Sequence, residues 1–486
     1  MEPDESLYTP FLEPLLKRPG TSLVPRSGIV WKDLMEVLSA LPHQQQRDSG
    51  ASLARNDSLL VTMNLASYPK KKYRSFRSVA LLILYQLLSA VRSQSFFQQY
   101  GQVRILLWVN DDVKGTFLPR SASRRRNSSM TADFSCDWLT EVAGLDSATE
   151  SVVSSSTARG STMVRDRRID LDSAYATLQR MRNAGISLPK GRETELFREM
   201  LQDANAAGQA GTQAQSLDRP FLQELRSLES ANAVSEFAKG TKELLRLKDL
   251  RYKLKITEAA NEKIFSFLSE LDRIASLRGQ GSITEEKLAE MDRSWNEKLS
   301  QNTNNFMSDF ILARDNLHLF RQDPPVLMWD RRSVEPLAVQ SSEFFPNVEC
   351  CLLDLQPRTM HPLLRETGPG SSRAGDVFEL ICSAVMGQSL KPLSKALESI
   401  WPGAAEGVLP HCPSLKDPAR GGLPGTGHAE LTPRILNETQ WMEILDAWMK
   451  WPFRPSYNEM IARLADDSEA PDPGEEGGNR VVSDCL

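Results

Sequence analysis

The chain has 486 residues, enough for two or three domains that each bury a core. Its 58 Lys and Arg against 63 Asp and Glu exclude a strong overall field, so any nucleic-acid binding has to come from local basic clusters. The six cysteines lack CxxC pairs and histidines at ligand spacing, which argues against a disulfide framework and leaves no predicted metal site. The best apolar run, 79–88, is too short for a membrane span, so we expect no membrane contact.

Residues 1–120 alternate between strand and helix signals and predict a partial α/β domain. Segments 27–31 and 59–63 are short and apolar or β-branched, which is typical of buried parallel strands. A third such segment, 103–109, follows an apolar segment at 79–91 whose length suits a helix. Strand, helix and strand in this order predict a βαβ unit.

The composition changes after residue 120. Residues 121–167 are rich in Ser, Arg and Thr and predict a flexible linker, with one short helix around 136–139. Residues 168–320 are polar, poor in Pro and periodic, and predict a helical insertion that packs as a bundle or hairpin against a neighbour. Its first apolar stripe consists of Leu171, Ala174, Leu178 and Met181.

The last part of the chain reads as a separate globular piece. Residues 321–465 are rich in Pro and Trp, begin with a strand-like segment at 334–337 and continue into helices. The acidic residues 466–486, rich in Gly and Pro, predict a disordered tail.

Candidate functional residues follow the predicted strands, because ligands of a doubly wound sheet bind at the carboxyl ends of its strands. Asn64 and Tyr68 follow 59–63, and Asp33 follows 27–31. Methylation of an adenine amine requires hydrogen-bond acceptors that free its lone pair and a ring that stacks on the flipped base. Asn64 and Tyr68 supply both groups, although an Asn after a strand is most often only a turn residue.

Three motifs in order resemble the rRNA adenine dimethyltransferase family. They are Met-Glu-Pro-Asp-Glu at 1–5, Ser-Gly-Ile-Val-Trp-Lys-Asp-Leu at 27–34, and Asn-Leu-Ala-Ser-Tyr-Pro-Lys-Lys at 64–71. Their wording is similar to the fungal mitochondrial transcription factor B branch of that family. Segments 335–337 and 343–347 look like the family's return strand and substrate-side segment.

The resemblance implies an incomplete class I, Rossmann-like methyltransferase domain that binds S-adenosyl-L-methionine, followed by the helical region and a mainly helical domain that faces nucleic acid. Glu2 would bind the ribose hydroxyls of the cofactor and Asp33 its adenine amine, while Asn64 would border the cofactor and hold the target base together with Tyr68. The family's first strand and Gly-rich loop should precede Glu2, so we expect upstream sequence to encode them together with an Arg-rich presequence.

Basic clusters are the second functional signal. Short basic runs are most often solvated surface, but their position beside the strand ends favours a phosphate track here. The residues concerned are Lys70, Lys71, Lys72, Arg74 and Arg77 after the base-holding motif, and Arg124, Arg125 and Arg126 after the 103–109 strand.

The resemblance implies a monomeric initiation factor of the mitochondrial matrix that helps mitochondrial RNA polymerase melt promoter DNA. The alternative is an active rRNA adenine N6-methyltransferase acting on rRNA. The missing Gly-rich loop and the change of Asn-Leu-Pro-Tyr to Asn-Leu-Ala-Ser-Tyr at 64–68 leave open whether the chain is an enzyme. A purely structural helical adaptor would leave the series Glu2, Asp33 and Asn64 unexplained.

Overall fold

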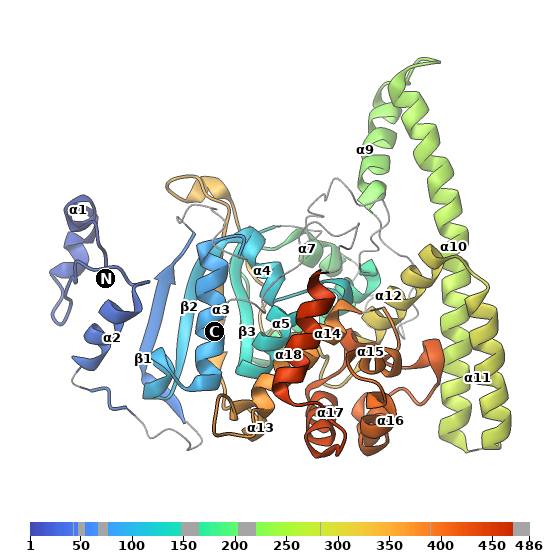
Figure 1. The fold of residues 1–486 in the computed structure, drawn as a ribbon. Coiled ribbons are helices and arrows are strands. Elements are labelled where there is room, and N and C mark those ends of the chain that lie inside the picture. The colour runs from blue at the N-terminus through green and yellow to red at the C-terminus, as the bar shows by residue number, and fades with distance from the viewer. Residues whose placement is uncertain are drawn as a thin grey trace.

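The protein is described from a computed structural model as a mixed α/β chain in which many helices surround one five-stranded sheet (Figure 1). The structure describes residues 1–41, 43–46, 54–66, 76–146, 165–202, 220–281, 283–388 and 390–469.

The sheet has four strands that run in one direction and one that is reversed. The strands are β1 (Arg55–Asn64), β2 (Gln102–Asn110), β3 (Cys136–Leu145), β4 (Leu337–Val339) and β5 (Cys350–Pro357), in the spatial order β1-β2-β5-β3-β4. The pairs β1–β2 and β3–β4 are parallel, whereas β5 is antiparallel to both of its neighbours, β2 and β3. The carboxyl ends of β1, β2, β3 and β4 therefore lie along one edge.

The predicted βαβ unit is confirmed. Helix α3 (Val79–Ser93) connects β1 to β2, and the Ser78 hydroxyl caps its first turn by accepting from the Leu81 amide. Leu84, Leu87 and Leu88 of α3 pack in the core that also holds the inward side chains of β2. Over the described residues, 79–100 is the one helical stretch that is long and apolar enough to span a membrane by length and composition, and its buried leucines are typical of a core helix.

The strand predicted at 27–31 is wrong. These residues form a turn closed by the Val30 amide on the Ser27 carbonyl, and helix α2 (Trp31–Ser39) begins at its end. Leu34 and Leu38 lie one helical turn apart and are both buried. Helical spacing over 31–38 therefore outweighs the strand preference of Ile29 and Val30.

The flexible linker predicted at 121–167 is wrong over its first half. Residues 122–145 form a 3-10 turn η2 (Ala122–Arg124), helix α5 (Asn127–Ser135) and strand β3, so the short helix predicted at 136–139 is in fact the start of a strand. Many of the polar side chains responsible for the linker prediction are buried with partners, as when Ser135 donates to the Thr131 carbonyl at 2.6 Å. Residues 147–164 lie outside the described residues.

The region 168–320 is helical as predicted. Its helices are α6 (Arg167–Asn183), α7 (Glu195–Gln202), α9 (Pro220–Val234), α10 (Lys242–Gln280), α11 (Glu285–Ser300) and α12 (Asn304–Arg321). The predicted stripe from Leu171 to Met181 is buried against α7. Trp295 and Phe310 anchor a second core between α10, α11 and α12.

The C-terminal part is mainly helical and packs around Trp441 and Trp448. Its helices are α13 (Pro362–Arg365), α14 (Ala374–Gly387), α15 (Leu393–Ile400), α16 (Ala404–Val408), α17 (Glu438–Lys450) and α18 (Tyr457–Glu469). The strand expected at 334–337 corresponds to β4, which begins three residues later than expected, at Leu337. The predicted tail 466–486 begins inside α18, and its residues from 470 onward lie outside the described residues.

The remaining elements are mostly short, and they flank or connect the helices and strands given above. They are α1 (Glu5–Leu16), η1 (Phe96–Tyr100), α4 (Asp111–Phe117), η3 (Met328–Arg331), η4 (Ser341–Glu343), η5 (Leu409–His411), η6 (Pro413–Leu415), η7 (Pro418–Arg420), η8 (Gly427–Ala429) and η9 (Pro433–Ile435).

Candidate functional site at the carboxyl ends of the strands

The carboxyl edge of the sheet divides into two halves of different character. The open half lies at the ends of β1 and β2 and comprises Asn64, Trp108, Phe344 and Phe345. The closed half lies at β3 and β4 and comprises charged side chains around Glu141 and Trp329.

Asn64 ends β1 in the open half and is exposed. Its side-chain oxygen accepts from the Ala66 amide at 3.1 Å, which closes a local turn. The next residue, Leu65, is buried, and its amide donates to the Trp108 carbonyl at 2.7 Å. The sheet therefore fixes the backbone beneath Asn64 while leaving its side chain accessible to solvent.

Aromatic rings lie close to Asn64. Asn64 and Trp108 are paired across β1 and β2, so their side chains leave the same face of the sheet. Phe344 lies edge-on to Trp108 with ring centroids 5.3 Å apart, and Phe345 is fully exposed. An accessible amide beside the half-buried ring of Trp108 has the chemistry needed to hold an unstacked base.

The structure does not bring Glu2, Asp33 and Asn64 into one site. The Glu2 carboxylate accepts from the Asp4 amide at 3.1 Å, and Asp33 lies 3.9 Å from the Arg26 guanidinium. Helix α2, which carries Asp33, stacks Trp31 on Phe96 of η1, just before the amino end of β2. Asn64 is at the opposite, carboxyl end of the neighbouring strand.

The predicted basic residues have different environments. Tyr68, Lys70, Lys71, Lys72 and Arg74 lie outside the described residues. Arg77 is exposed directly before the cap of α3, and Arg124 and Arg126 are exposed around η2.

The prediction that Arg125 belongs to the phosphate track is wrong, because only 2 % of this residue is exposed. Its guanidinium donates to Asp133 at 2.9 Å and to the backbone carbonyls of Arg434 and Leu436 at 2.8 Å each. Arg125 therefore joins α5 to the C-terminal part of the chain, and its guanidinium is not available to a phosphate.

In the closed half, a buried lysine bridges two carboxylates. Lys114 Nζ lies 2.7 Å from both Asp111 Oδ1 and Glu141 Oε1. Burial raises the pKa of Asp111, and Lys114 works against this shift. Burial also acts to lower the pKa of Lys114, but Glu141 and Asp111 outweigh it, so the pKa of Lys114 is raised.

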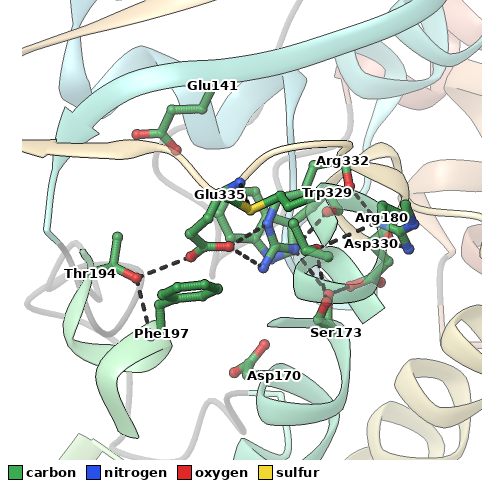
Figure 2. Close-up of polar contacts among 12 residues, drawn as sticks. Glu141, Asp170, Ser173, Arg180, Thr194, Phe197, Trp329, Asp330, Arg332 and Glu335 are labelled. Atoms are coloured by element: carbon green, nitrogen blue, oxygen red, sulfur yellow. Dashed lines mark hydrogen bonds and ion pairs between the residues drawn. The ribbon is translucent and has the colours of Figure 1, made fainter. Parts of the chain in front are cut away.

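Two arginines stack on Trp329 beside this bridge. Figure 2 shows one of them, Arg332, at the Trp329 ring together with Glu335. The guanidinium carbons of Arg120 and Arg332 lie 3.7 and 4.0 Å from the ring centroid. Two guanidinium groups at these heights would clash on one face of an indole, so they cover opposite faces. Arg120 also contacts Glu141 at 3.3 Å, and Arg332 contacts Glu335 at 2.8 Å, which links the two carboxylates through the ring.

The network continues into α6 through Asp330. Its carboxylate binds the Arg165 guanidinium through two contacts of 2.7 and 2.8 Å and accepts from Ser173 at 2.6 Å. Burial raises the pKa of Asp170 to about 6, and the neighbouring Arg165 works against that shift. The cavity between Arg120, Glu141 and Glu335 measures about 10 Å³, which is room for no more than one water.

The closed half is therefore an ion-paired contact between the sheet, α6 and η3, without room for a ligand. The buried indole nitrogen of Trp329 has no hydrogen-bond partner among the described residues. Within the described ranges, no group of three or more His, Cys, Asp or Glu is arranged to hold a metal ion. Sequence analysis missed this network. Its one local signal is Glu141, a charged residue at an inward position of β3 between the buried Leu139 and Ala143.

Comparisons of the chain with protein-family models, with curated proteins and with solved structures find no match.

Proposed function

We propose that the chain is a nucleic-acid-binding initiation factor of mitochondrial transcription that holds melted promoter DNA at the open half of its sheet. The observation that carries this proposal is the reversed strand β5, which lies between β2 and β3 in a sheet whose other strands share one direction. The last strand of a class I methyltransferase sheet is likewise reversed and inserted between two earlier strands. This topology supports the scaffold implied by the motifs at 27–34 and 64–71.

The position of the motifs within the sheet gives further support. Asn64 ends the first strand of the βαβ unit, and segment 343–347 leads into β5 on the same edge. The exposed ring of Phe345 and the half-buried Trp108 offer faces on which a base can stack, at about 1–3 kcal/mol per base. A base inside a duplex cannot reach such a surface, so melted or single-stranded DNA is the expected ligand.

The described residues do not form a pocket that fits S-adenosyl-L-methionine. Glu2 stabilises the start of α1, and Asp33 faces Arg26, away from Asn64. The alternative function, an active rRNA adenine N6-methyltransferase, therefore has less support. Calorimetric titration of the chain with S-adenosyl-L-methionine should show no binding, and tight binding lost in Asp33→Ala would favour the alternative.

Fluorescence anisotropy with labelled DNA tests the proposal directly. The chain should bind a promoter fragment with a central unpaired bubble more tightly than the matched duplex. Replacing Lys70, Lys71 and Lys72 with Ala should flatten the slope of log affinity against log salt by about two units, since each neutralised phosphate contributes about 0.7 on single strands. Equal slopes for the wild type and this variant would mean that the three lysines contact no phosphate and are only solvated surface residues.

A matched pair of phenylalanines separates stacking from charge. Phe345→Ala should weaken bubble binding by about 1–3 kcal/mol with an unchanged salt slope. Phe453→Ala is the control, because Phe453 is also exposed but lies between α17 and α18. Equal effects of the two substitutions would contradict a base-stacking role for the open half.

Initiation assays with the cognate mitochondrial RNA polymerase test the cellular role. The chain should stimulate transcription from a closed linear promoter and have little effect on a template already melted at the start site. Equal stimulation of both templates would contradict a role in melting, and formation of dimethyladenosine in rRNA would establish the alternative.

A further inference from the structure

An arm formed by α9 and the first part of α10 extends away from the rest of the chain (Figure 1). The two helices hold each other through a small core made of Phe221 and Leu225 on α9 and Leu247 and Leu250 on α10. Arg246 and Arg251 of α10 pair with Glu224 and Glu229 of α9. The side of α10 that carries these residues therefore faces α9 and is occupied by the contact between the two helices.

The outward side of α10 carries an exposed apolar stripe. Leu245, Tyr252 and Ile256 are 59, 67 and 54 % exposed. At about 100° per residue they fall within roughly 40° of arc, opposite the buried Leu247 and Leu250. We call Leu245, Tyr252 and Ile256 the outer stripe.

One flank of the outer stripe is basic. Lys248 and Lys255 are exposed on the same side of it, and the structure records no ion pair for either among the described residues. Segment 242–255 as a whole contains six basic and two acidic residues, although the protein is acidic overall. An apolar stripe with a basic flank complements a helix that is apolar on one face and acidic beside it.

We propose that the outer stripe is a docking site for an acidic amphipathic helix of a partner protein. Two of its three side chains, Leu245 and Ile256, are aliphatic and bury well against another helix but offer nothing to a phosphate or a base. The stripe spans twelve residues, or about 16 Å along the axis, which matches about three turns of a partner helix. This inference is independent of the proposed role in transcription.

The test uses the full chain and a synthetic peptide of about 20 residues with a heptad repeat, Leu at the seam positions and Glu beside them. Anisotropy should show that this peptide binds at least tenfold more tightly than a scrambled peptide of the same composition. The double variant Leu245→Ser with Tyr252→Ser should lose about tenfold or more, because both side chains leave the contact. Val234→Ser is the matched control, since Val234 is 90 % exposed on the arm but lies at the end of α9.

A charge reversal keeps the test decisive even if the double variant loses helicity by circular dichroism. Lys248→Glu with Lys255→Glu should weaken binding of the Glu peptide and strengthen binding of a peptide with Lys in place of Glu. Equal affinity for the amphipathic and scrambled peptides would overturn the proposal. Displacement of the peptide by single-stranded DNA, together with DNA binding insensitive to the Leu245 and Tyr252 changes, would overturn it in favour of a phosphate site.

Discussion

The two halves of the sheet edge start from the same backbone geometry and end in opposite states. Glu141 near the end of β3 is 2 % exposed and lies within contact of Lys114 and Arg120, whereas Asn64 at the end of β1 is exposed and, among the described residues, its side chain bonds to its own turn. Both positions belong to the carboxyl edge where an α/β sheet usually binds its ligand. A position at the end of a strand therefore marks a possible ligand site. Ion pairs with neighbouring charged residues decide whether the side chain at that position is available to a ligand.

The side chains of the closed half are inaccessible to a ligand, and their ion pairs fix how the surrounding elements are arranged. The attraction within buried pairs such as Arg165–Asp330 largely offsets the cost of removing the charges from water, so the pairs add little net stability. Removing one partner is different, because it leaves a buried charge without compensation.

The largest effect is expected at Asp330. Asp330→Ala should lower the free energy of unfolding by about 3–5 kcal/mol, since Arg165 would stay buried after losing the carboxylate that binds it through two contacts, and would keep its contact with Asp170. Urea unfolding followed by circular dichroism measures the change. Asp446→Ala is the control, because Asp446 forms an exposed pair with Lys450 and should cost less than about 0.5 kcal/mol. Similar losses in the two variants would mean that the buried Arg165–Asp330 pair contributes no more to stability than an exposed ion pair.

Two adjacent arginines provide the next contrast. Arg125→Ala should reduce the free energy of unfolding by about 2–3 kcal/mol and leave the salt slope of DNA binding unchanged, because the buried guanidinium binds Asp133 and two carbonyls. Arg126→Ala should change stability by less than about 0.5 kcal/mol, because Arg126 is exposed. Unfolding curves and salt titrations of both variants check this. A flatter salt slope for Arg125→Ala alone would restore Arg125 to the phosphate track.

The closed half should also respond to pH through Asp170. Its pKa is about 6 in the folded protein against an ordinary value of 3.8, so the folded state binds more protons between these values. Stability contributed by the protonated carboxyl is present below about pH 4 and is lost as pH rises through 6, by about 2–3 kcal/mol. Asp170→Asn should therefore gain this amount relative to the wild type between pH 4 and 7 in urea unfolding. A constant difference across that range would mean that Arg165 keeps Asp170 ionised throughout.

A smaller change in stability than at Asp330, Arg125 or Asp170 is expected in the open half. Among the described residues, Asn64→Ala removes the side-chain hydrogen bond to the Ala66 amide, and it should cost less than about 1 kcal/mol in thermal or urea unfolding. Weaker bubble binding by the same folded variant would place the function of Asn64 in its exposed amide. A loss comparable to that of Asp330→Ala would instead make Asn64 part of the structural framework.

Local patterns predicted the elements that local sequence determines. The apolar segments 59–63, 79–91 and 103–109 became β1, α3 and β2. Helix α3 and alternate residues of β2 are buried in one core, whereas segment 59–63, predicted as a buried strand, lies at the sheet edge and packs only partly buried alternate residues against that core. Strand β3 was not predicted, because Asp137 and Glu141 interrupt its apolar positions and the segment lies within a stretch of sequence rich in Ser and Arg. Glu141 reads as a surface residue until the positions of Lys114 and Arg120 are known.

The candidate site was predictable only in part for the same reason. Asn64 was found from its place after an apolar strand, a local signal, and its turn geometry agrees with the alternative interpretation as a turn residue. The partners in the closed half are distant in sequence, as Arg165 and Asp330 are 165 residues apart. The burial of Arg125 is equally non-local, because its carbonyl partners follow more than 300 residues later.

The most direct test of the account places a photo-crosslinking phenylalanine analogue at position 345 of the full chain, with the same analogue at position 453 as the control. Both side chains are exposed, but only Phe345 directly follows Phe344, whose ring packs edge-on to Trp108 at the open half. With bubble DNA under irradiation, position 345 should crosslink to nucleotides of the unpaired segment and position 453 should not. Crosslinks of equal yield from both positions, or from position 345 to duplex flanks alone, would contradict the assignment of melted DNA to the open half.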